Sequence, residues 1–311
     1  MTTALSVSSL NSTNVRFLFQ TLVRRAALRA SSALSPGLAG AWAERLFLTP
    51  PRPRFPESAI FDLIDARQSF VEHRGRAIAT WRWGAHERPA VLLAHGWGGT
   101  AAQMRRFVFP LAAAGYRVVA FDQPAHGLSG GTLTGLPDFA DVLREVAWHH
   151  GGVQAVIAHS LGGAATALAI ARGLPLERAV LVAPPADLTA YSRRFARWHR
   201  IPESVRGTMQ AAIEERFGVR WADLEISRVA ERLDVQALVI HDRGDKVVPF
   251  AQGERFARHW PGARVLLTDG LGHHRILQDD EVAGAAVAFV AGRSGVAGPA
   301  VPHPPLPAPL Y

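Results

Sequence analysis

Residues 155 to 163 constrain the fold of this chain more than any other stretch. They read Ala-Val-Ile-Ala-His-Ser-Leu-Gly-Gly, a short apolar strand that runs into Ser160 and then opens into a helix. A serine on so sharp a turn has a strained backbone, and neighbouring strands approach it only if the residues two before and two after are small. Those residues are Ala158 and Gly162. The pattern indicates a serine nucleophile; the alternative is an ordinary serine N-cap after a buried strand, because serine is a favoured cap.

Two later strand ends supply the partners that a serine nucleophile requires. A serine is inert unless a histidine takes its proton and a carboxylate orients that histidine. Asp245 follows an apolar strand at 237–241, and His273 follows another at 264–267. Open parallel sheets place their chemistry just past the carboxyl ends of their strands. We therefore expect Ser160, Asp245 and His273 at one edge of a sheet.

Four motifs in register resemble the α/β-hydrolase superfamily, and more narrowly its compact serine hydrolases of the esterase or serine aminopeptidase-like kind. The resemblance runs from about residue 78 to residue 290, and Ala158 departs from the usual glycine. The motifs are His-Gly-Trp-Gly-Gly at 95–99 after strand 91–94, Asp-Gln-Pro-Ala-His-Gly-Leu-Ser at 122–129 after strand 118–121, the turn at Ser160, and the loops that carry Asp245 ahead of Val-Pro and His273 behind Gly-Leu-Gly.

The resemblance implies a fold and a set of roles. The fold is an α/β-hydrolase fold, a mostly parallel eight-stranded sheet flanked by helices with a small helical cap. Ser160 would be the nucleophile, His273 the base and Asp245 the acid, in the chain order typical of this fold. The backbone N–H groups of Trp97 and Leu161 would form the oxyanion hole, since two donors are needed for the charge of a tetrahedral intermediate.

Several neighbouring residues are alternatives to these assignments. Asp242 lies three residues before Asp245, and Asp187 follows strand 180–183, which is the other known placement of the acid in this superfamily. His274 adjoins His273, and only one of two adjacent side chains can point at the serine. His95, His126 and His159 are expected to be structural, and Asp122 to hydrogen-bond its own turn.

The chain is expected to have three parts. Residues 1–56 form a helical prefix and a proline-rich connector, residues 57–291 form the hydrolase domain, and the Gly/Pro-rich tail 292–311 is expected to be disordered. The domain begins with an antiparallel hairpin that turns at Gly75. An insertion at about 186–234, without strands, is interpreted as the cap; Phe195 and Trp198 in it, together with Trp97, are tentative pocket residues.

Composition limits the partners. The net charge is +8, but the basic residues are scattered arginines, so we expect no nucleic-acid partner. The absence of cysteine excludes thiolate metal sites, and no metal or other cofactor is implied. The prefix has apolar residues at helical spacing with Arg24 and Arg25 on other faces, so it either packs on the body, contacts a membrane surface or is a presequence. A secretory signal is not expected, because charged residues follow the apolar stretch and do not precede it, and a cytoplasmic location is expected.

The expected function is that of a serine hydrolase acting through an acyl-enzyme on a carboxylic ester or thioester of small to medium size. An amidase, a peptidase-like enzyme and a carbon–carbon bond hydrolase use the same triad and remain alternatives. A noncatalytic binding protein with this fold is disfavoured because Ser160, His273 and Asp245 are all present. The oligomeric state is open.

Overall fold

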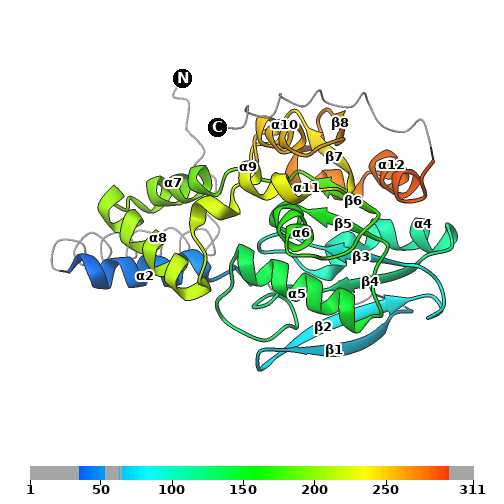
Figure 1. The fold of residues 1–311 in the computed structure, drawn as a ribbon, viewed down its shortest axis with the longest axis horizontal. Coiled ribbons are helices and arrows are strands. Elements are labelled where there is room, and N and C mark those ends of the chain that lie inside the picture. Colours follow the sequence, from blue (N-terminus) through cyan, green and yellow to red (C-terminus); the bar gives the residue numbers. More distant parts are fainter. Residues whose placement is uncertain (1–34, 53–62, 64, 294–311) are drawn as a thin grey trace, which may run out of the picture. The chain divides into compact units, whose positions relative to one another are not determined.

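The computed structural model describes residues 35–52, 63 and 65–293, which form two compact units (Figure 1). The larger unit consists of Leu48–Leu188 and the chain from Val219 onward. The smaller unit consists of the chain up to Phe47 together with Thr189–Gly218. The predictions about the prefix before residue 35, most of the proline-rich connector and nearly all of the tail concern residues outside those described.

An eight-stranded sheet forms the centre of the larger unit (Figure 1). Its strand order is β1-β2-β4-β3-β5-β6-β7-β8. The pairs β1–β2 and β2–β4 are antiparallel, and every other neighbouring pair is parallel. The strands are β1 (Arg67–His73), β2 (Arg76–Trp83), β3 (Ala90–Ala94), β4 (Arg117–Phe121), β5 (Ala155–His159), β6 (Arg178–Val182), β7 (Gln236–Asp242) and β8 (Arg264–Thr268).

The central strands are mostly apolar because both faces of the sheet are covered. In β3, Leu92 and Ala94 belong to the core on one face, whereas Val91 and Leu93 belong to the core on the other. A strand that is buried on both sides cannot alternate polar and apolar residues. This is why β3 reads as an unbroken apolar run in the sequence.

The predicted hairpin that turns at Gly75 is confirmed. Its two-residue loop is Arg74-Gly75, and both residues have a positive φ, 49° and 76°. Such a turn matches the right-handed twist of the flanking strands. It places β1 at the edge of the sheet.

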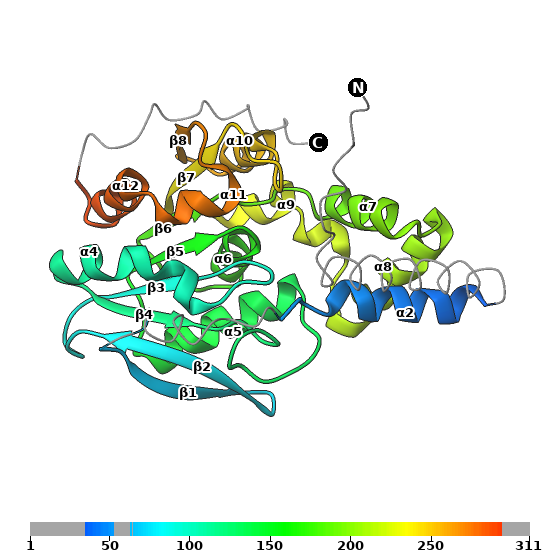
Figure 2. The ribbon, with the colours of Figure 1, turned by 180° about the vertical axis from the view of Figure 1, so that it is seen from behind.

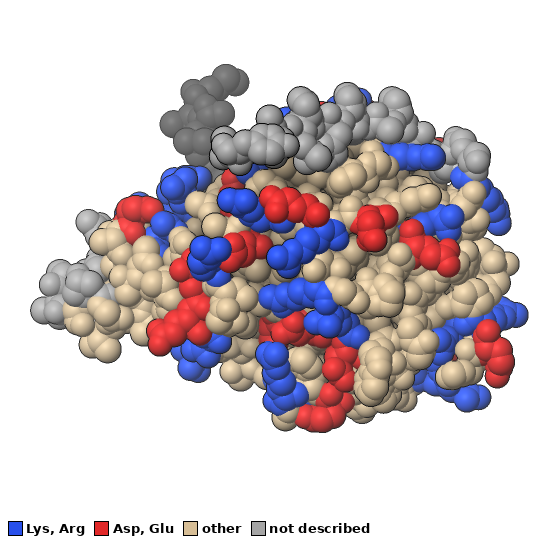
Figure 3. All heavy atoms as spheres, viewed as in Figure 1, with Lys and Arg blue, Asp and Glu red and all other residues tan. Residues whose placement is uncertain are grey.

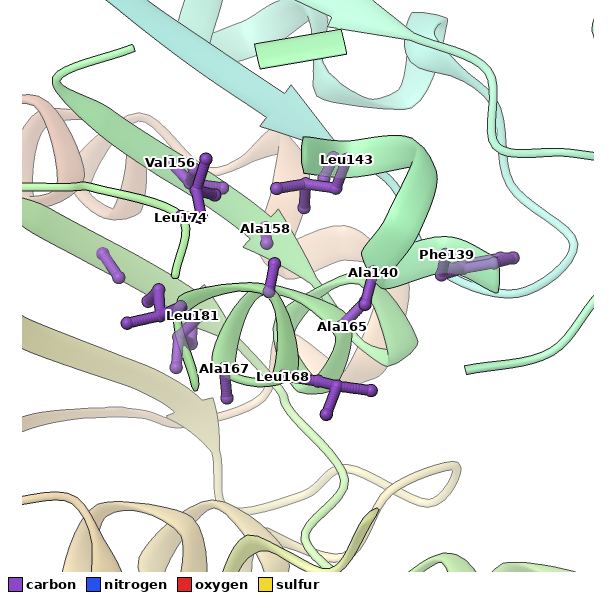
Figure 4. Close-up of a cluster of buried hydrophobic side chains, with 14 of the residues drawn as sticks. Phe139, Ala140, Leu143, Val156, Ala158, Ala165, Ala167, Leu168, Leu174 and Leu181 are labelled. Atoms are coloured by element: carbon purple, nitrogen blue, oxygen red, sulfur yellow. The ribbon is translucent and has the colours of Figure 1, made fainter. Parts of the chain in front are cut away.

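One face of the sheet is covered by helices that carry the larger core (Figure 1). Figure 4 shows Leu143 of α5 near Val156 of β5, with Leu181 of β6 in the same cluster of buried side chains beside α6. The helices of this face are α5 (Leu136–His149), α6 (Leu161–Ala171), α9 (Ile226–Val229) and α10 (Phe250–His259), with the 3-10 turns Trp221–Leu224 and Ala230–Arg232 beside them.

The opposite face is covered by α4 and α12, which lie in front of the sheet in Figure 2. The Asp279 carboxylate caps the start of α12 by accepting a hydrogen bond from the Val282 N–H at 3.0 Å. The elements on this side are the 3-10 helix Ala101–Phe107, α4 (Val108–Ala113), α11 (Gly272–Arg275), the 3-10 turn Ile276–Gln278 and α12 (Asp280–Val290).

Among the described residues, the smaller unit contains three helices, α2 (Pro36–Leu48), α7 (Leu188–His199) and α8 (Glu203–Phe217). The last residue of α2, Leu48, and the first residue of α7, Leu188, belong to the larger unit. Phe47 of α2 packs edge-on against Tyr191 and Phe195 of α7, with ring centroids 5.8 and 5.0 Å apart. Arg216 of α8 pairs with Glu44 of α2. The segment interpreted as one cap is thus divided, because residues 189–218 belong to this unit and residues from 219 onward to the other. The position of a cap over the site stays a prediction.

No helix among residues 35–52 and 65–293 is both long enough and apolar enough to span a bilayer.

Candidate active site

Ser160 lies on the sharp turn between β5 and α6. Its backbone has φ 50° and ψ −124°, a conformation that a non-glycine residue adopts at a cost of about 1–3 kcal/mol. The Ser160 N–H donates to the Val182 carbonyl at 2.8 Å, and the Ser160 carbonyl accepts from the Gly163 N–H at 2.8 Å. These bonds hold the strained turn and leave the side chain half-buried at the end of the strand.

The turn requires small neighbours because the loop after β3 presses against it. A Cβ on Gly162 would lie 2.6 Å from the His95 carbonyl oxygen and 2.8 Å from that of Ala94. A Cβ on Gly96 would lie 2.7 Å from the Ser160 Cβ. The glycine two residues after the serine therefore has the steric reason expected from the sequence.

The structure brings Ser160, His273 and Asp245 into one hydrogen-bonded row. The Ser160 Oγ is 3.1 Å from the Nε2 of His273, and the Nδ1 of His273 is 2.7 Å from the Oδ2 of Asp245. Asp245 follows β7, and His273 lies in α11 behind β8; both side chains are buried. The carboxyl ends of β5, β7 and β8 thus contribute one group each.

The carboxylate of Asp245 has four donors around it. Its Oδ1 accepts from the N–H groups of Val247 and Val248 at 2.8 and 2.9 Å, and its Oδ2 lies 3.5 Å from the Nε2 of His241. Burial raises the pKa of Asp245, but the hydrogen bonds from His241, His273 and Val248 outweigh it and hold that pKa well below the usual range. The group is therefore ionised across the physiological pH range.

Asp242 has a different role from Asp245. Its Oδ1 accepts from the Gly244 N–H at 2.9 Å, and its Oδ2 accepts from the Leu271 N–H and the Thr268 hydroxyl, both at 2.9 Å. Burial raises the pKa of Asp242, and these hydrogen bonds lower it by more. Asp242 ties the loop that carries the acid to the loop that carries the histidine.

The third candidate acid lies elsewhere. Asp187 pairs with Arg255 of α10 at 2.9 Å. Among the described residues, the carboxylate that hydrogen-bonds the His273 ring is that of Asp245. Of the two adjacent histidines, His273 is buried against Ser160 while His274 is exposed.

His95 and His126 hold the loops around Ser160. The Nε2 of His95 accepts from the Gln123 N–H at 2.9 Å, and the Nε2 of His126 accepts from the Gly98 N–H at 2.9 Å. In each ring the Nδ1 then donates to a backbone carbonyl, that of Gly96 at 2.7 Å for His95 and that of Pro124 at 3.0 Å for His126. The expected structural role of these two histidines is confirmed.

His159 supports the catalytic histidine candidate directly. Its Nε2 donates to the His273 carbonyl at 2.9 Å, and the two ring centroids are 4.7 Å apart. His159 immediately precedes Ser160, so one strand end positions both the serine and the backbone of His273. The structural role expected for His159 is confirmed, but its partner could not be predicted from the sequence, since the contact joins residues 114 positions apart.

Asp122 organises the remaining loop. Its carboxylate accepts from the Leu128 N–H in its own turn and from the Ala101 N–H, both at 2.8 Å. The expected contact with its own turn is confirmed, and the second contact ties the turn to the neighbouring loop.

His241 is a site residue that the sequence reasoning did not single out. The sequence feature that could have indicated it is the position of this histidine at the end of an apolar run, four residues before Asp245.

The two backbone N–H groups expected to form an oxyanion hole, those of Trp97 and Leu161, belong to residues that follow Gly96 and Ser160, and these two residues contact each other. Neither N–H donates a hydrogen bond to another residue that the structure describes. Both N–H groups, one on the loop after β3 and one at the start of α6, are therefore without an acceptor among the described residues.

The tentative pocket residues fall in different units. The half-buried Trp97 ring stacks on Phe139 of α5 and meets His126 edge-on, at centroid distances of 6.2 and 5.5 Å. Phe195 and Trp198 lie on α7 in the smaller unit. Within the described part of the chain, no three His, Asp or Glu side chains are grouped so as to hold a metal ion.

Residues 91–286 match the alpha/beta hydrolase family. The chain belongs to this family. The match makes the chain a hydrolase by family, and the expected fold class is confirmed. Which bond it cleaves is a question for the chemistry of the site.

Individual relatives of this α/β-hydrolase are distant. It is 25% identical to the bifunctional esterase/perhydrolase DCH of Acinetobacter calcoaceticus over 244 residues, which cover 61% of this chain and 87% of that relative. A stretch of 101 residues is 38% identical to the magnesium-chelatase 30 kDa subunit of Rhodobacter capsulatus and spans 31% of this chain and 35% of that subunit. The structure resembles an esterase of Pyrococcus furiosus with a TM-score of 0.61 at 20% identity, covering 80% of this chain and 98% of that one.

The buried histidines predict how the stability of this α/β-hydrolase depends on pH. Burial lowers the pKa of His126 to about 4 and the pKa of His159 to about 3. An unfolded histidine titrates near pH 6.5. As the pH falls from about 6.5 to 4, these histidines become protonated in the unfolded chain but stay neutral in the native state. The free energy of unfolding therefore falls, by up to roughly 3 kcal/mol for His126 alone. Asp122 opposes this, since burial raises its pKa to about 6, but it is one group against several histidines.

We therefore expect the melting temperature to drop between pH 7 and pH 4.5, measured by circular dichroism. His150→Leu should flatten this dependence. Burial lowers the pKa of His150 to about 4, and its Nε2 has no hydrogen-bond partner among the described residues, so the variant removes a titrating group and no Nε2 hydrogen bond. The exposed His86→Ala is the control. A melting temperature that does not change between pH 7 and pH 4.5 would contradict the lowered pKa values of the buried histidines.

Proposed function

We propose that this protein is a serine esterase that cleaves carboxylic esters or thioesters of small to medium size through an acyl-enzyme. One observation carries the proposal. The Ser160 Oγ is within hydrogen-bond distance of the Nε2 of His273, whose other ring nitrogen is hydrogen-bonded to the ionised Asp245. This is the arrangement by which a serine hydroxyl becomes a nucleophile.

The first half of the reaction forms the acyl-enzyme. Since the Asp245 carboxylate can only accept, the Nδ1 of His273 carries the proton and the Nε2 has its lone pair toward Ser160. The Ser160 Oγ forms a bond to the carbonyl carbon of the substrate while its proton moves to the Nε2 of His273. Asp245 then stabilises the imidazolium that this transfer creates.

The backbone N–H groups of Trp97 and Leu161 are proposed to stabilise the negative charge that develops on the carbonyl oxygen, by donating hydrogen bonds to it. Their lack of partners among the described residues supports this assignment, because a donor already engaged elsewhere is not available to an oxyanion. Removing one such donor typically lowers the rate by a factor on the order of a hundred or more. The glycine-rich loop around Trp97 is held by His95 and His126, so these donors are fixed before the substrate arrives.

The acyl-enzyme forms when the tetrahedral intermediate collapses, the bond to the alcohol or thiol breaks, and His273 returns its proton to that leaving group. The second half of the reaction releases the acid. A water molecule attacks the acyl carbon while His273 takes the water proton; the bond between the acyl carbon and the Ser160 Oγ then breaks, and His273 returns that proton to the Oγ, which restores the free hydroxyl. No group other than the substrate, water and these side chains is needed to balance the reaction.

The substrate class is supported by resemblance and by the pocket assignment. The relative from Acinetobacter calcoaceticus is called an esterase, and it is similar over most of its length. Trp97 is proposed to contact the acyl group, because it adjoins Gly96, which lies against Ser160. Phe195 and Trp198 belong to the smaller unit, and the pocket role expected for them from the sequence stays a prediction.

A panel of p-nitrophenyl esters from acetyl to dodecanoyl, run beside a matched thioester and a matched anilide, tests the proposal. We expect kcat/KM to be highest for a short or medium ester and far lower for the anilide. A burst of p-nitrophenol equal to the enzyme concentration is expected, since the acyl-enzyme accumulates. Turnover of the anilide alone, or of no substrate in the panel, would contradict an esterase. Trp97→Ala should move the preferred acyl length.

A further inference from the structure

A short segment at the start of the larger unit lies on the loop that follows β4. We call this segment, residues 48–52, the strap. The Leu48 carbonyl accepts a hydrogen bond from the Thr134 N–H at 2.9 Å, and the Leu48 side chain is buried. Four residues further on, Arg52 makes hydrogen bonds to the same loop. Both ends of the strap are therefore fixed to one loop.

The guanidinium of Arg52 binds backbone oxygens. Its Nε donates to the Ala125 carbonyl at 2.9 Å, and its Nη2 donates to the Gly131 carbonyl at 2.6 Å and to the Ser129 carbonyl at 3.5 Å. Charged donors make stronger hydrogen bonds than neutral ones. Other arginines are interspersed with acidic side chains over the face that Figure 3 shows, and several of them form ion pairs. Arg52 instead joins three carbonyls of a single loop.

Ala125 is the point at which this loop needs support. It has a φ of 64°, a left-handed conformation that residues other than glycine rarely adopt. Its N–H donates to the Gly130 carbonyl at 2.8 Å, and its own carbonyl accepts from Arg52. The hydrogen bond from Arg52 therefore holds the peptide group between Ala125 and His126 in an orientation that an alanine does not favour by itself.

His126 connects this peptide group to residues 95–99, which we call the oxyanion loop. The Nε2 of His126 accepts from the Gly98 N–H at 2.9 Å, and Gly98 directly follows Trp97. The strap also touches the oxyanion loop, because a Cβ on Gly98 would lie 2.9 Å from the Pro51 Cγ. The strap thus contacts Gly98 directly and reaches His126 through the peptide group before it.

The charge of Arg52 favours the state of the His126 ring that this contact requires. The Nε2 must carry no proton if it is to accept from the Gly98 N–H. Burial lowers the pKa of His126 to about 4; the hydrogen bond to Pro124 opposes this shift, and the positive charge of Arg52 adds to it. The ring is therefore neutral at pH 7.

We propose that the strap fixes the oxyanion loop and that Arg52 is a positioning residue for the Trp97 N–H. This role rests on the proposed function, in which that N–H donates to the oxyanion. Arg52 acts through the Ala125 carbonyl and the His126 ring, and not on the substrate. Its loss would leave the Trp97 N–H in place but less well oriented, so the effect should be smaller than the hundredfold or more that follows from losing a donor.

Arg52→Gln in the full chain tests this role. We expect kcat for the best ester of the panel to fall about tenfold and KM to change less than about twofold, because the N–H acts on the transition state more than on the bound ester. A trifluoromethyl ketone with the same acyl chain forms an adduct with a serine nucleophile that carries an oxyanion. Its inhibition constant should rise about tenfold as well. Arg52→Lys keeps the charge but lacks the forked donor, so it should lie between the two.

Hydrogen exchange of the Gly98 amide measures the loosening without a substrate. This amide should exchange about tenfold faster in Arg52→Gln than in the unaltered chain, because its acceptor His126 is less well held. Faster exchange in a chain that cleaves no ester would refute the proposed function and would still support the strap. The two failures are therefore distinguishable.

Arg88→Gln is the matched control. Arg88 is exposed in the same unit, and its guanidinium also donates to a backbone carbonyl, that of Ala112 in α4, at 3.4 Å. This variant should leave kcat, the inhibition constant and the exchange rate unchanged, and the melting temperature establishes that each variant is folded. The proposal is overturned if the Gly98 amide exchanges at the same rate in Arg52→Gln and the unaltered chain. It is also overturned if kcat of an active esterase does not fall together with the affinity for the ketone, or if Arg88→Gln has the same effects.

Discussion

Ser160→Ala is expected to abolish ester turnover and labelling by a fluorophosphonate probe while leaving the fold intact. The hydroxyl is the group that His273 can deprotonate, and the structure puts it 3.1 Å from the Nε2 of that ring. Loss of a serine nucleophile in a comparable triad lowers kcat by up to roughly a millionfold. Turnover is measured with the best ester of the panel, and labelling is measured by mass spectrometry of the modified peptide.

The control is Ser204→Ala, which removes an exposed hydroxyl from α8 and should leave labelling and turnover unchanged. Because Ser160 is held by backbone hydrogen bonds to Val182 and Gly163, the alanine variant should melt close to the unaltered chain. Labelling of another serine in the unaltered protein would show that the nucleophile has been misassigned.

Asp245→Asn is expected to lower kcat by about ten-thousandfold. An asparagine presents an N–H where the carboxylate accepts, so the imidazole is driven toward the tautomer whose Nε2 carries the proton. That nitrogen then cannot accept the proton of Ser160. The loss should be in kcat more than in KM, because Asp245 is buried behind the histidine and touches no substrate.

Asp242→Asn separates the two neighbouring acids. Asp242 accepts from two backbone N–H groups and a hydroxyl, so the amide leaves at least one of these donors without an acceptor. That loss costs about 1–3 kcal/mol of stability. We therefore expect a lower melting temperature than that of the unaltered chain, and a much smaller loss of kcat than for Asp245→Asn. Asp187→Asn, which breaks the contact with Arg255, is the second control. A larger loss of kcat in Asp187→Asn than in Asp245→Asn would move the triad acid to the loop after β6.

Local physical chemistry made much of the fold predictable from the sequence. Apolar runs such as 91–94 and 155–159 are strands because both faces of the sheet are covered, and the chain order of strands and helices follows from those runs. Gly162 was predictable because a strand, a serine and a helix with small residues around the serine form a recognisable pattern, although the atoms that exclude a Cβ there belong to Ala94 and His95, far away in the sequence. The candidate site could be named because each of its members follows the end of a strand, and parallel strands end at one edge.

Only the tertiary structure decided which of several similar side chains meet. Asp245, Asp242 and Asp187 are all carboxylates just past strand ends, and the direction of a single side chain determines that Asp245 faces His273. Likewise, the sequence offers two adjacent histidines, and only the structure shows that the ring of His273 faces Ser160, which lies 113 residues earlier in the chain.

The sequence by itself determined the strand ends, the turn at Ser160 and the three residue types of the site, because these are visible in residue size and in the hydrophobic pattern of neighbouring residues. The tertiary structure alone decided that His159 holds the backbone of His273 and that Asp242 joins two loops. The physical reason is that hydrogen bonding and exposure depend on directions in space between elements far apart in the chain, and no pattern of neighbouring residues records those directions.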